Sequence, residues 1–208
     1  QYTLTADVSD AAGNPAPTVT SSTFTVDTTA PNISSISVIS NNTGNNKLAK
    51  EGEVITFTVT FSETVTLSNA SDVKVPFKIG GGTSKEALAQ STTTTANAID
   101  FQYTVANGDT GDVALETEAN GTLKALTLSN SATVLDSIGN ALTGVMSSLD
   151  LPTVVVDTTD PNSPTINTIT NTTTNNTRPT ITGTGVSGDT ITLSDTGNRI
   201  SETTTVTS

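Results

Sequence analysis

The chain of 208 residues is 33% hydrophobic and 3% aromatic, and its formal net charge at pH 7 is −12. Such an acidic chain is a poor partner for nucleic acid or an anionic membrane, and we expect no membrane insertion because no apolar run reaches about 18 residues. Because Cys and His are absent, disulfides, thiolate or imidazole zinc sites and Ser-His-Asp catalysis are excluded.

The apolar residues are few, but they are arranged in short alternating runs with threonine between them. A low hydrophobic content alone is compatible with disorder. Thr and Val, however, are β-branched and fit a half-buried pleated surface. The pattern therefore predicts an all-β fold of thin sandwiches with small cores.

The first piece, residues 1–27, is predicted to be a β-hairpin. Tyr2, Leu4, Ala6 and Val8 alternate with polar residues, and Val19 to Val26 form the return strand. The run Asp10-Ala11-Ala12-Gly13-Asn14-Pro15 is typical of a turn, because Asp can bond its own backbone and Gly tolerates a positive φ. Two strands alone are marginal in water, so this piece is not expected to be a domain by itself.

The middle piece, residues 28–157, carries enough strands for one complete sandwich. Asp136-Ser137-Ile138-Gly139-Asn140 repeats the Asp-x-x-Gly-Asn turn of the first piece. Pro76 indicates an edge strand, and Lys85 to Gln90 are predicted to form a short helical turn. Many short strands separated by turn sequences indicate an antiparallel sandwich. The expected strands are Ile33–Ile39, Val54–Phe61, Val65–Leu67, Val73–Ile79, Ile99–Val105, Val113–Leu115, Leu123–Leu128 and Val154–Val156.

The last piece, residues 158–208, is predicted to be the opening strands of a further sandwich. Ile166 and Ile169 mark its first strand, and Pro179 to Thr184 form the second. Ile191 and Leu193 lie on a third strand, and Thr203 to Thr207 form a fourth. No closing hairpin follows them in this piece.

The three pieces meet at two copies of one short sequence. Val26-Asp27-Thr28-Thr29-Ala30-Pro31-Asn32 returns as Val156-Asp157-Thr158-Thr159-Asp160-Pro161-Asn162. In each copy a β-rich run ends at a proline, which lacks the N–H that pairing requires. A sequence repeated between strand-rich segments indicates a joint between modules. We call residues 26–32 the first joint and residues 156–162 the second joint.

These features together resemble the bacterial Ig-like repeats of large surface adhesins and extracellular fibre proteins. The Asp-x-x-Gly-Asn turn followed by a strand and Val-Asp-Thr-Thr-x-Pro is similar to the domain endings of such repeats. The segment from Gly52 to Glu63 resembles their second strand, and Pro179 to Gly185 resembles the early strands of a smaller type. The resemblance implies Ig-like antiparallel β-sandwiches, an extracellular or cell-surface location and often calcium at the joints, but no particular ligand.

The outer pieces are complementary, since the first supplies only a closing hairpin and the last supplies only opening strands. One interpretation is an excerpt of a longer repeat array, in which neighbouring Ig-like repeats complete both pieces. The other is a split domain, in which the hairpin of one copy completes the last piece of the next by strand addition. Such head-to-tail contacts propagate an open filament. The expected subunit interface consists of Tyr2, Leu4, Ala6, Val8, Val19, Phe24 and Val26 from one copy and Ile166, Ile181, Ile191 and Leu193 from the next.

Calcium is the expected cofactor, because hard cations bind several oxygen ligands. In an Ig topology the joint, the loop after the second strand and the last hairpin turn share one pole, which gathers Asp27, Glu63 and Asp136 with Asn140 nearby. The opposite pole gathers Asp109, Asp112, Asp157 and Asp160. The alternative is that these are turn-forming Asp residues that cap their own backbone.

The sequence therefore favours a non-enzymatic extracellular structural protein, which forms a stalk or the repeating subunit of a fibre or sheath. A competing interpretation is a binding module whose loops around residues 80–95 hold a receptor or glycan. Catalysis is disfavoured, because sugar-cleaving sites need paired carboxylates in a cleft and usually aromatic platforms. The chain has two Tyr and no Trp.

Overall fold

The computed structural model describes residues 1–90, 94–117, 122–124, 126–143, 153–168, 180–194 and 201–207. In these ranges the chain is all-β, and its one helical segment is the short 3-10 turn η1, Ala70–Asp72. The chain forms two compact units, residues 1–158 and residues 159–208. No helix in the described ranges is long and apolar enough to cross a membrane.

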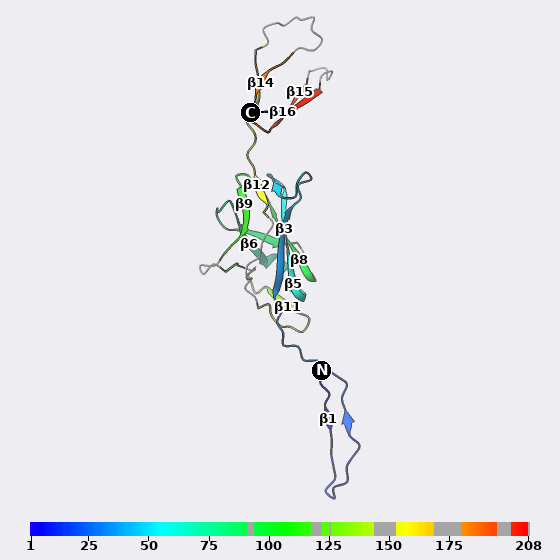
Figure 1. Ribbon diagram of the computed structural model, residues 1–208. Coiled ribbons are helices and arrows are strands. Elements are labelled where there is room, and N and C mark those ends of the chain that lie inside the picture. Colours follow the sequence, from blue (N-terminus) through cyan, green and yellow to red (C-terminus); the bar gives the residue numbers. More distant parts are fainter. Residues whose placement is uncertain are drawn as a thin grey trace. The chain divides into compact units, whose positions relative to one another are not determined.

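The first 26 residues form a hairpin, which we call the N-terminal hairpin (Figure 1). Strand β1, Thr5–Ala6, pairs antiparallel with β2, Val19–Thr20. Isolated bridges extend this pairing from Tyr2 to Phe24 and from Ser9 to Pro15. The strands are shorter than the sequence predicts, because the hairpin has no second layer on which to pack, and all of its residues are exposed.

The rest of the first unit is a ten-stranded mixed sheet that curls nearly into a barrel. Strand β5, Val54–Ser68, is its longest element, pairing with β3, Ile33–Ser40, and with β8, Thr94–Thr104. Along the first half of β5 the inward residues alternate with threonine, as period-2 patterning requires. The sequence predicts two separate strands here, whereas the structure has one strand with a bulge in its pairing to β8 between Thr60 and Val65.

The remaining strands complete the sheet in the order β11-β5-β8-β7-β6-β9-β12-β4, with β3 on β5 and β10 on β6. All of these pairs are antiparallel except β4 and β12, which are parallel. The expectation of a purely antiparallel sandwich is therefore corrected at this edge, where the short β4 runs beside the last strand of the unit. The bounds are β4 Leu48–Ala49, β6 Val73–Ile79, β7 Lys85–Ala89, β9 Thr110–Leu115, β10 Thr127–Leu128, β11 Thr133–Asp136 and β12 Val155–Asp157.

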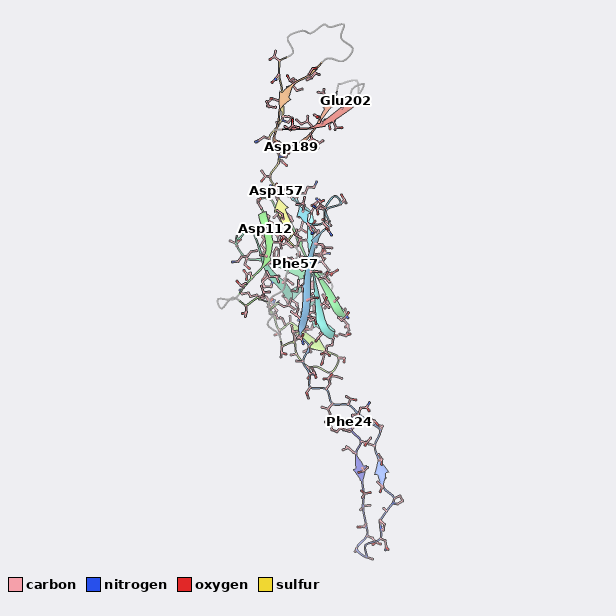
Figure 2. All side chains as sticks on the ribbon, in the orientation of Figure 1. Phe24, Phe57, Asp112, Asp157, Asp189 and Glu202 are labelled. Carbon is pink, nitrogen blue, oxygen red and sulfur yellow. The ribbon has the colours of Figure 1, made fainter. Side chains whose placement is uncertain are left out.

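One hydrophobic core lies inside this sheet. Phe57, labelled in Figure 2, lies on β5 and is fully buried. It packs against Phe77 of β6, with 4.8 Å between the ring centroids. The Phe77 ring also forms a T-shaped contact with Tyr103, with 5.1 Å between the ring centroids. Burial of one such large apolar side chain contributes about 1.5–3 kcal/mol. A compact core is therefore achieved with few aromatic residues.

Two sequence predictions for the middle piece are wrong. Residues Lys85–Ala89 form strand β7 and not a helical turn, because Ala87 is buried and the segment pairs with β6 and β8. Pro76 does not mark an edge, since β6 has β7 on one side and β9 on the other. Its carbonyl accepts the Glu116 N–H at 3.2 Å, although proline has no N–H to donate to the sheet.

Residues 159–208 form the second unit, which we call the C-terminal unit. Strand β13, Thr165–Ile166, pairs with β14, Gly183–Thr184, and β15, Thr190–Ser194, pairs with β16, Ser201–Thr205. No described residue of this unit belongs to a buried core. Of the residues expected on its strands, Ile169 and Pro179 lie outside the described ranges.

Candidate functional site

The first joint is fixed to the sheet by backbone hydrogen bonds at its proline end. Asn32 exchanges bonds with Ser62, whose N–H donates to the Asn32 carbonyl at 2.9 Å and whose hydroxyl accepts the Asn32 N–H at 3.1 Å. The Thr143 N–H donates to the Pro31 carbonyl at 3.1 Å, and Pro31 is buried. At the other end of the joint, the Asp27 carboxylate accepts the Thr29 N–H at 2.9 Å.

The turn after β11 is organised by the carboxylate of Asp136. One of its oxygens accepts the backbone N–H groups of Ile138, Gly139 and Asn140, and the other accepts the Asn140 side-chain amide at 2.8 Å. Asp136 is only 5% exposed. Burial acts to raise the pKa of this carboxyl, but the bonds from Asn140, Ile138 and Gly139 outweigh it and hold the pKa below its ordinary value.

Asn140 joins this turn to the first joint. Its amide nitrogen lies 3.3 Å from the Asp27 carbonyl and 3.3 Å from the Thr29 carbonyl. Asn140, expected near a metal, therefore offers its amide as a hydrogen-bond donor that clamps the joint. The clamp ties the end of the domain to its beginning, across more than a hundred residues of sequence.

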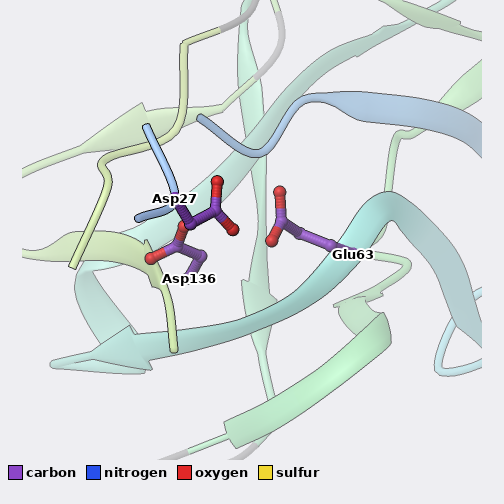
Figure 3. Close-up of side chains that lie close together, drawn as sticks. All are labelled: Asp27, Glu63 and Asp136. Atoms are coloured by element: carbon purple, nitrogen blue, oxygen red, sulfur yellow. The ribbon is translucent and has the colours of Figure 1, made fainter. Parts of the chain in front are cut away.

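An acidic group lies beside this clamp (Figure 3). The carboxylates of Asp27, Glu63 and Asp136 each offer an oxygen, and these oxygens lie within 4.8 Å of one another. Glu63 lies in the stretch of β5 where the pairing to β8 is interrupted, and a bulge of this kind re-aims side chains. The first expected pole is thus assembled from three distant parts of the sequence.

The donor set of this group fits a hard divalent cation. Calcium binds carboxylate and carbonyl oxygens at about 2.3–2.6 Å, so two ligand oxygens on one ion are separated by at most about 5 Å. Asp27, Glu63 and Asp136 would hold the ion, and its charge would offset the repulsion among three carboxylates. Asp136 Oδ1 accepts three backbone N–H groups, whereas Oδ2 accepts only the Asn140 amide, so Oδ2 is the oxygen with a lone pair left for the cation.

The second expected pole has a different arrangement. Asp109 is 8% exposed and forms an ion pair with Lys85, with 2.6 Å between Nζ and Oδ1. Its other oxygen accepts the Tyr103 hydroxyl at 2.7 Å and the Ala106 N–H at 3.0 Å. Within the described ranges, no group of three carboxylates includes Asp109, Asp112, Asp157 or Asp160.

The Lys85–Tyr103–Asp109 network is a feature that sequence reasoning missed. Lys85 lies at the start of β7, and its ammonium is also 5.4 Å from the centroid of the Tyr103 ring. The bond with Asp109 is the main reason that the pKa of Lys85 is raised. The available signal was the Asn107–Asp112 turn, but its partner Lys85 was placed on a predicted helical turn and not on a paired strand.

The expected interface residues are mostly exposed. This holds for Tyr2, Leu4, Val8, Val19, Phe24 and Val26 of the N-terminal hairpin and for Ile166 and Ile181 of the C-terminal unit. Ala6 is also exposed, whereas Ile191 and Leu193 are half-buried. Comparison with models of known protein families, with curated proteins and with solved structures found no match.

Proposed function

We propose that this chain is a non-enzymatic structural subunit of a bacterial extracellular fibre, sheath or adhesin stalk, built from Ig-like domains. One observation carries the proposal. A domain with a closed core is flanked by a hairpin and a unit that expose large apolar residues and have no described core residue of their own. Apolar surface of this kind is stabilised when a partner covers it.

The partner in this proposal is a second copy of the chain. Its N-terminal hairpin adds to the strands of the neighbouring C-terminal unit, so that the two together make one sandwich. Strand addition supplies main-chain hydrogen bonds to open edges, and alternate side chains fill the shared core. Because the contact is head-to-tail, copies continue in one direction as a filament.

Calcium at the first joint is part of the proposal. An ion held by Asp27, Glu63 and Asp136 would link the joint, the β5 bulge and the turn after β11. Binding to the folded state alone would stabilise it by about 2.7 kcal/mol at a hundredfold excess over the dissociation constant. The resemblance to bacterial Ig-like repeats, the short proline-containing joints and the net charge of −12 support an extracellular, load-bearing role.

Electron microscopy of the purified chain tests the proposal, in calcium and in chelator. We expect filaments with a regular subunit repeat in calcium, and their loss in chelator would locate the ion's effect at the joints. A Glu63→Gln variant should lose the calcium response, whereas Glu86→Gln, on exposed β7 surface, should keep it. Single particles at every concentration would contradict self-assembly and favour a longer chain in which neighbouring repeats complete both pieces.

A further inference from the structure

We propose that the N-terminal hairpin recognises the second joint of another copy through Asn14, whose side-chain amide donates to the carbonyls of Asp157 and Thr159. This inference rests on the proposed self-assembly and names the contact that would set its register. The pattern is taken from the chain itself, where Asn140 makes the same two bonds to Asp27 and Thr29.

The two Asp-x-x-Gly-Asn turns share three hydrogen bonds to the carboxylate of their first residue. Asp10 accepts the Ala12 N–H and the Asn14 N–H, each at 2.9 Å, and the Asn14 side chain at 2.8 Å. Asp136 accepts the equivalent three bonds from Ile138 and Asn140. The central glycines also agree, with φ of 89° at Gly13 and 102° at Gly139. The first turn is therefore a preformed copy of the second.

The match continues into the strands on both sides of the turns. A bridge pairs Ser9 with Pro15, and an equivalent bridge pairs Leu135 with Ala141. The Ala16 N–H donates to the Val8 carbonyl at 2.8 Å, as the Leu142 N–H donates to the Val134 carbonyl at 2.9 Å. Residues 8–16 thus have the backbone arrangement of residues 134–142.

The environments of the two turns differ completely. Val134, next to the second turn, is 2% exposed because β11 pairs with β5 and packs on the core. Val8, at the equivalent position, is 68% exposed. The Asn140 amide uses its second donor on the joint, whereas no bond beyond that to Asp10 is found for the Asn14 side chain in the described ranges. Residues 8–16 therefore have the backbone of a packed turn but no packing partner within the described part of their own chain.

The second joint has the acceptors that this donor requires. Residues 156–159 repeat Val-Asp-Thr-Thr of residues 26–29, so the equivalents of the Asp27 and Thr29 carbonyls are those of Asp157 and Thr159. A carbonyl oxygen accepts two hydrogen bonds, so the contact does not depend on these groups being otherwise unbonded. Next to them Pro161 is exposed, although its equivalent Pro31 is buried.

A hollow of about 180 Å³ lies beside the second joint, lined in part by Pro161, Pro164 and Ile191. A hairpin docked on the joint would cover the apolar side chains that line this hollow. One bond of the pattern is not repeated. Thr143 donates its N–H to the Pro31 carbonyl, but the equivalent residue of the hairpin is Pro17, which has no N–H. The second N–H of the Asn14 amide, shared between the two carbonyls, therefore carries the polar recognition.

Sedimentation velocity of the full chain over a range of concentrations tests the inference. We expect Asn14→Ala to raise the concentration needed for assembly by about tenfold, the effect of losing one N–H donor that the two carbonyls share. Asn97→Ala, which removes the same amide from an exposed position of β8, should leave assembly unchanged. Val8→Asp keeps the turn residues and should abolish assembly, because it places a charge at the position of the buried Val134.

The outcomes separate the two proposals. If the wild-type chain does not assemble, the proposed function fails and the inference fails with it. If the wild-type chain assembles but Asn14→Ala and Asn97→Ala behave alike, the clamp is overturned while the proposed function stands. Unchanged assembly of Val8→Asp would overturn the docking arrangement itself.

Discussion

Among individual residues, the partly buried ion pair between Lys85 and Asp109 illustrates how burial affects the contribution of a charge. Its N–O distance of 2.6 Å equals that of the pair between Lys74 and Glu86. The difference is exposure, since the Asp109 side chain is 8% exposed and the Glu86 side chain 42%. Water therefore screens the second pair more than the first, so the first should contribute more to stability.

We expect Lys85→Met to lower the free energy of unfolding by about 3 kcal/mol, because it leaves the Asp109 carboxylate buried without its counter-ion. Lys74→Met is the matched control and should cost less than about 1 kcal/mol. Urea unfolding measures both. The double variant Lys85→Met with Asp109→Asn should recover part of the loss, and equal costs for the two single variants would contradict the interpretation.

The same pair predicts how stability depends on pH. Burial acts to raise the pKa of Asp109, but Lys85, Tyr103 and the Ala106 N–H outweigh it, so the folded pKa lies below the ordinary value of 3.8. The stabilisation is therefore present above about pH 4 and is lost as pH falls through the folded pKa. Lys85 has a raised pKa and stays charged over this whole range.

We accordingly expect wild type to be more stable than Asp109→Asn at pH 6 and the difference to shrink steadily towards pH 2. Unfolding free energies of the two proteins at four or five pH values measure this. A difference that stays constant down to pH 2 would show that Asp109 does not contribute as an ionised group.

At this scale, much of the first pole could be predicted from sequence and little of the second. Asp27 lies in a joint and Asp136 in a turn, both predicted from sequence. Glu63 was expected in the loop after the second strand and lies instead within β5, but the structure brings the three carboxylates together. The partner of Asp109 was not predictable, because Lys85 lies on a strand whose short sequence Lys-Glu-Ala-Leu-Ala is also typical of a helix. Pairing with β6 and β8 overrides this local preference.

At the scale of elements, two glycines bring the turn after β6 into contact with the start of β9. A Cβ on Gly80 would lie 2.2 Å from the Thr110 carbonyl oxygen, and a Cβ on Gly111 would lie 2.5 Å from the Gly80 Cα. Backbone therefore packs directly on backbone here, which only glycine permits. The Gly80 N–H also donates to the Asp112 carbonyl at 2.9 Å.

We expect Gly111→Ala to lower the free energy of unfolding by more than about 2 kcal/mol, because it combines a clash with backbone and a φ of 118°. Gly81→Ala is the control, since Gly81 also has a positive φ of 70° but open space around it. It should cost only about 1 kcal/mol. Thermal unfolding of both variants distinguishes steric contact from backbone strain alone, and similar losses would contradict the close approach.

Strand positions were readable where alternation was strong, as in β3, β5 and β8. The pairing between strands was not predictable, because neither a bulge nor the identity of a neighbouring strand is encoded by a local sequence pattern. The three-residue run of glycines at residues 80–82 was read only as a break, whereas the structure uses Gly80 for a backbone contact with a strand thirty residues away. Long-range packing of this kind explains why Pro76 also was misread.

At the scale of the whole molecule, the duplicated joint and the duplicated turn divide the chain into parts with different degrees of completion. The middle part contains both the joint and the turn that clamps it, and it has the core. The N-terminal hairpin has a turn that clamps no joint, and no Asp-x-x-Gly-Asn turn comes after the second joint in the described ranges. The sequence repeat made this division predictable, whereas the clamp itself depends on an amide orientation that only coordinates show.

Removal of residues 1–26 should separate folding from assembly. Because no residue of the N-terminal hairpin is buried, we expect the melting temperature of the core domain to change by less than about 2 °C, within the effect of a few tenths of a kcal/mol. The first joint is retained from Asp27 onward, so the Asn140 clamp and the acidic group persist. Differential scanning calorimetry measures this, and the same sample should remain monomeric by sedimentation velocity. A fall of more than about 5 °C would show that the hairpin stabilises the domain from which it extends, and filaments formed by the truncated chain would show that assembly uses another surface.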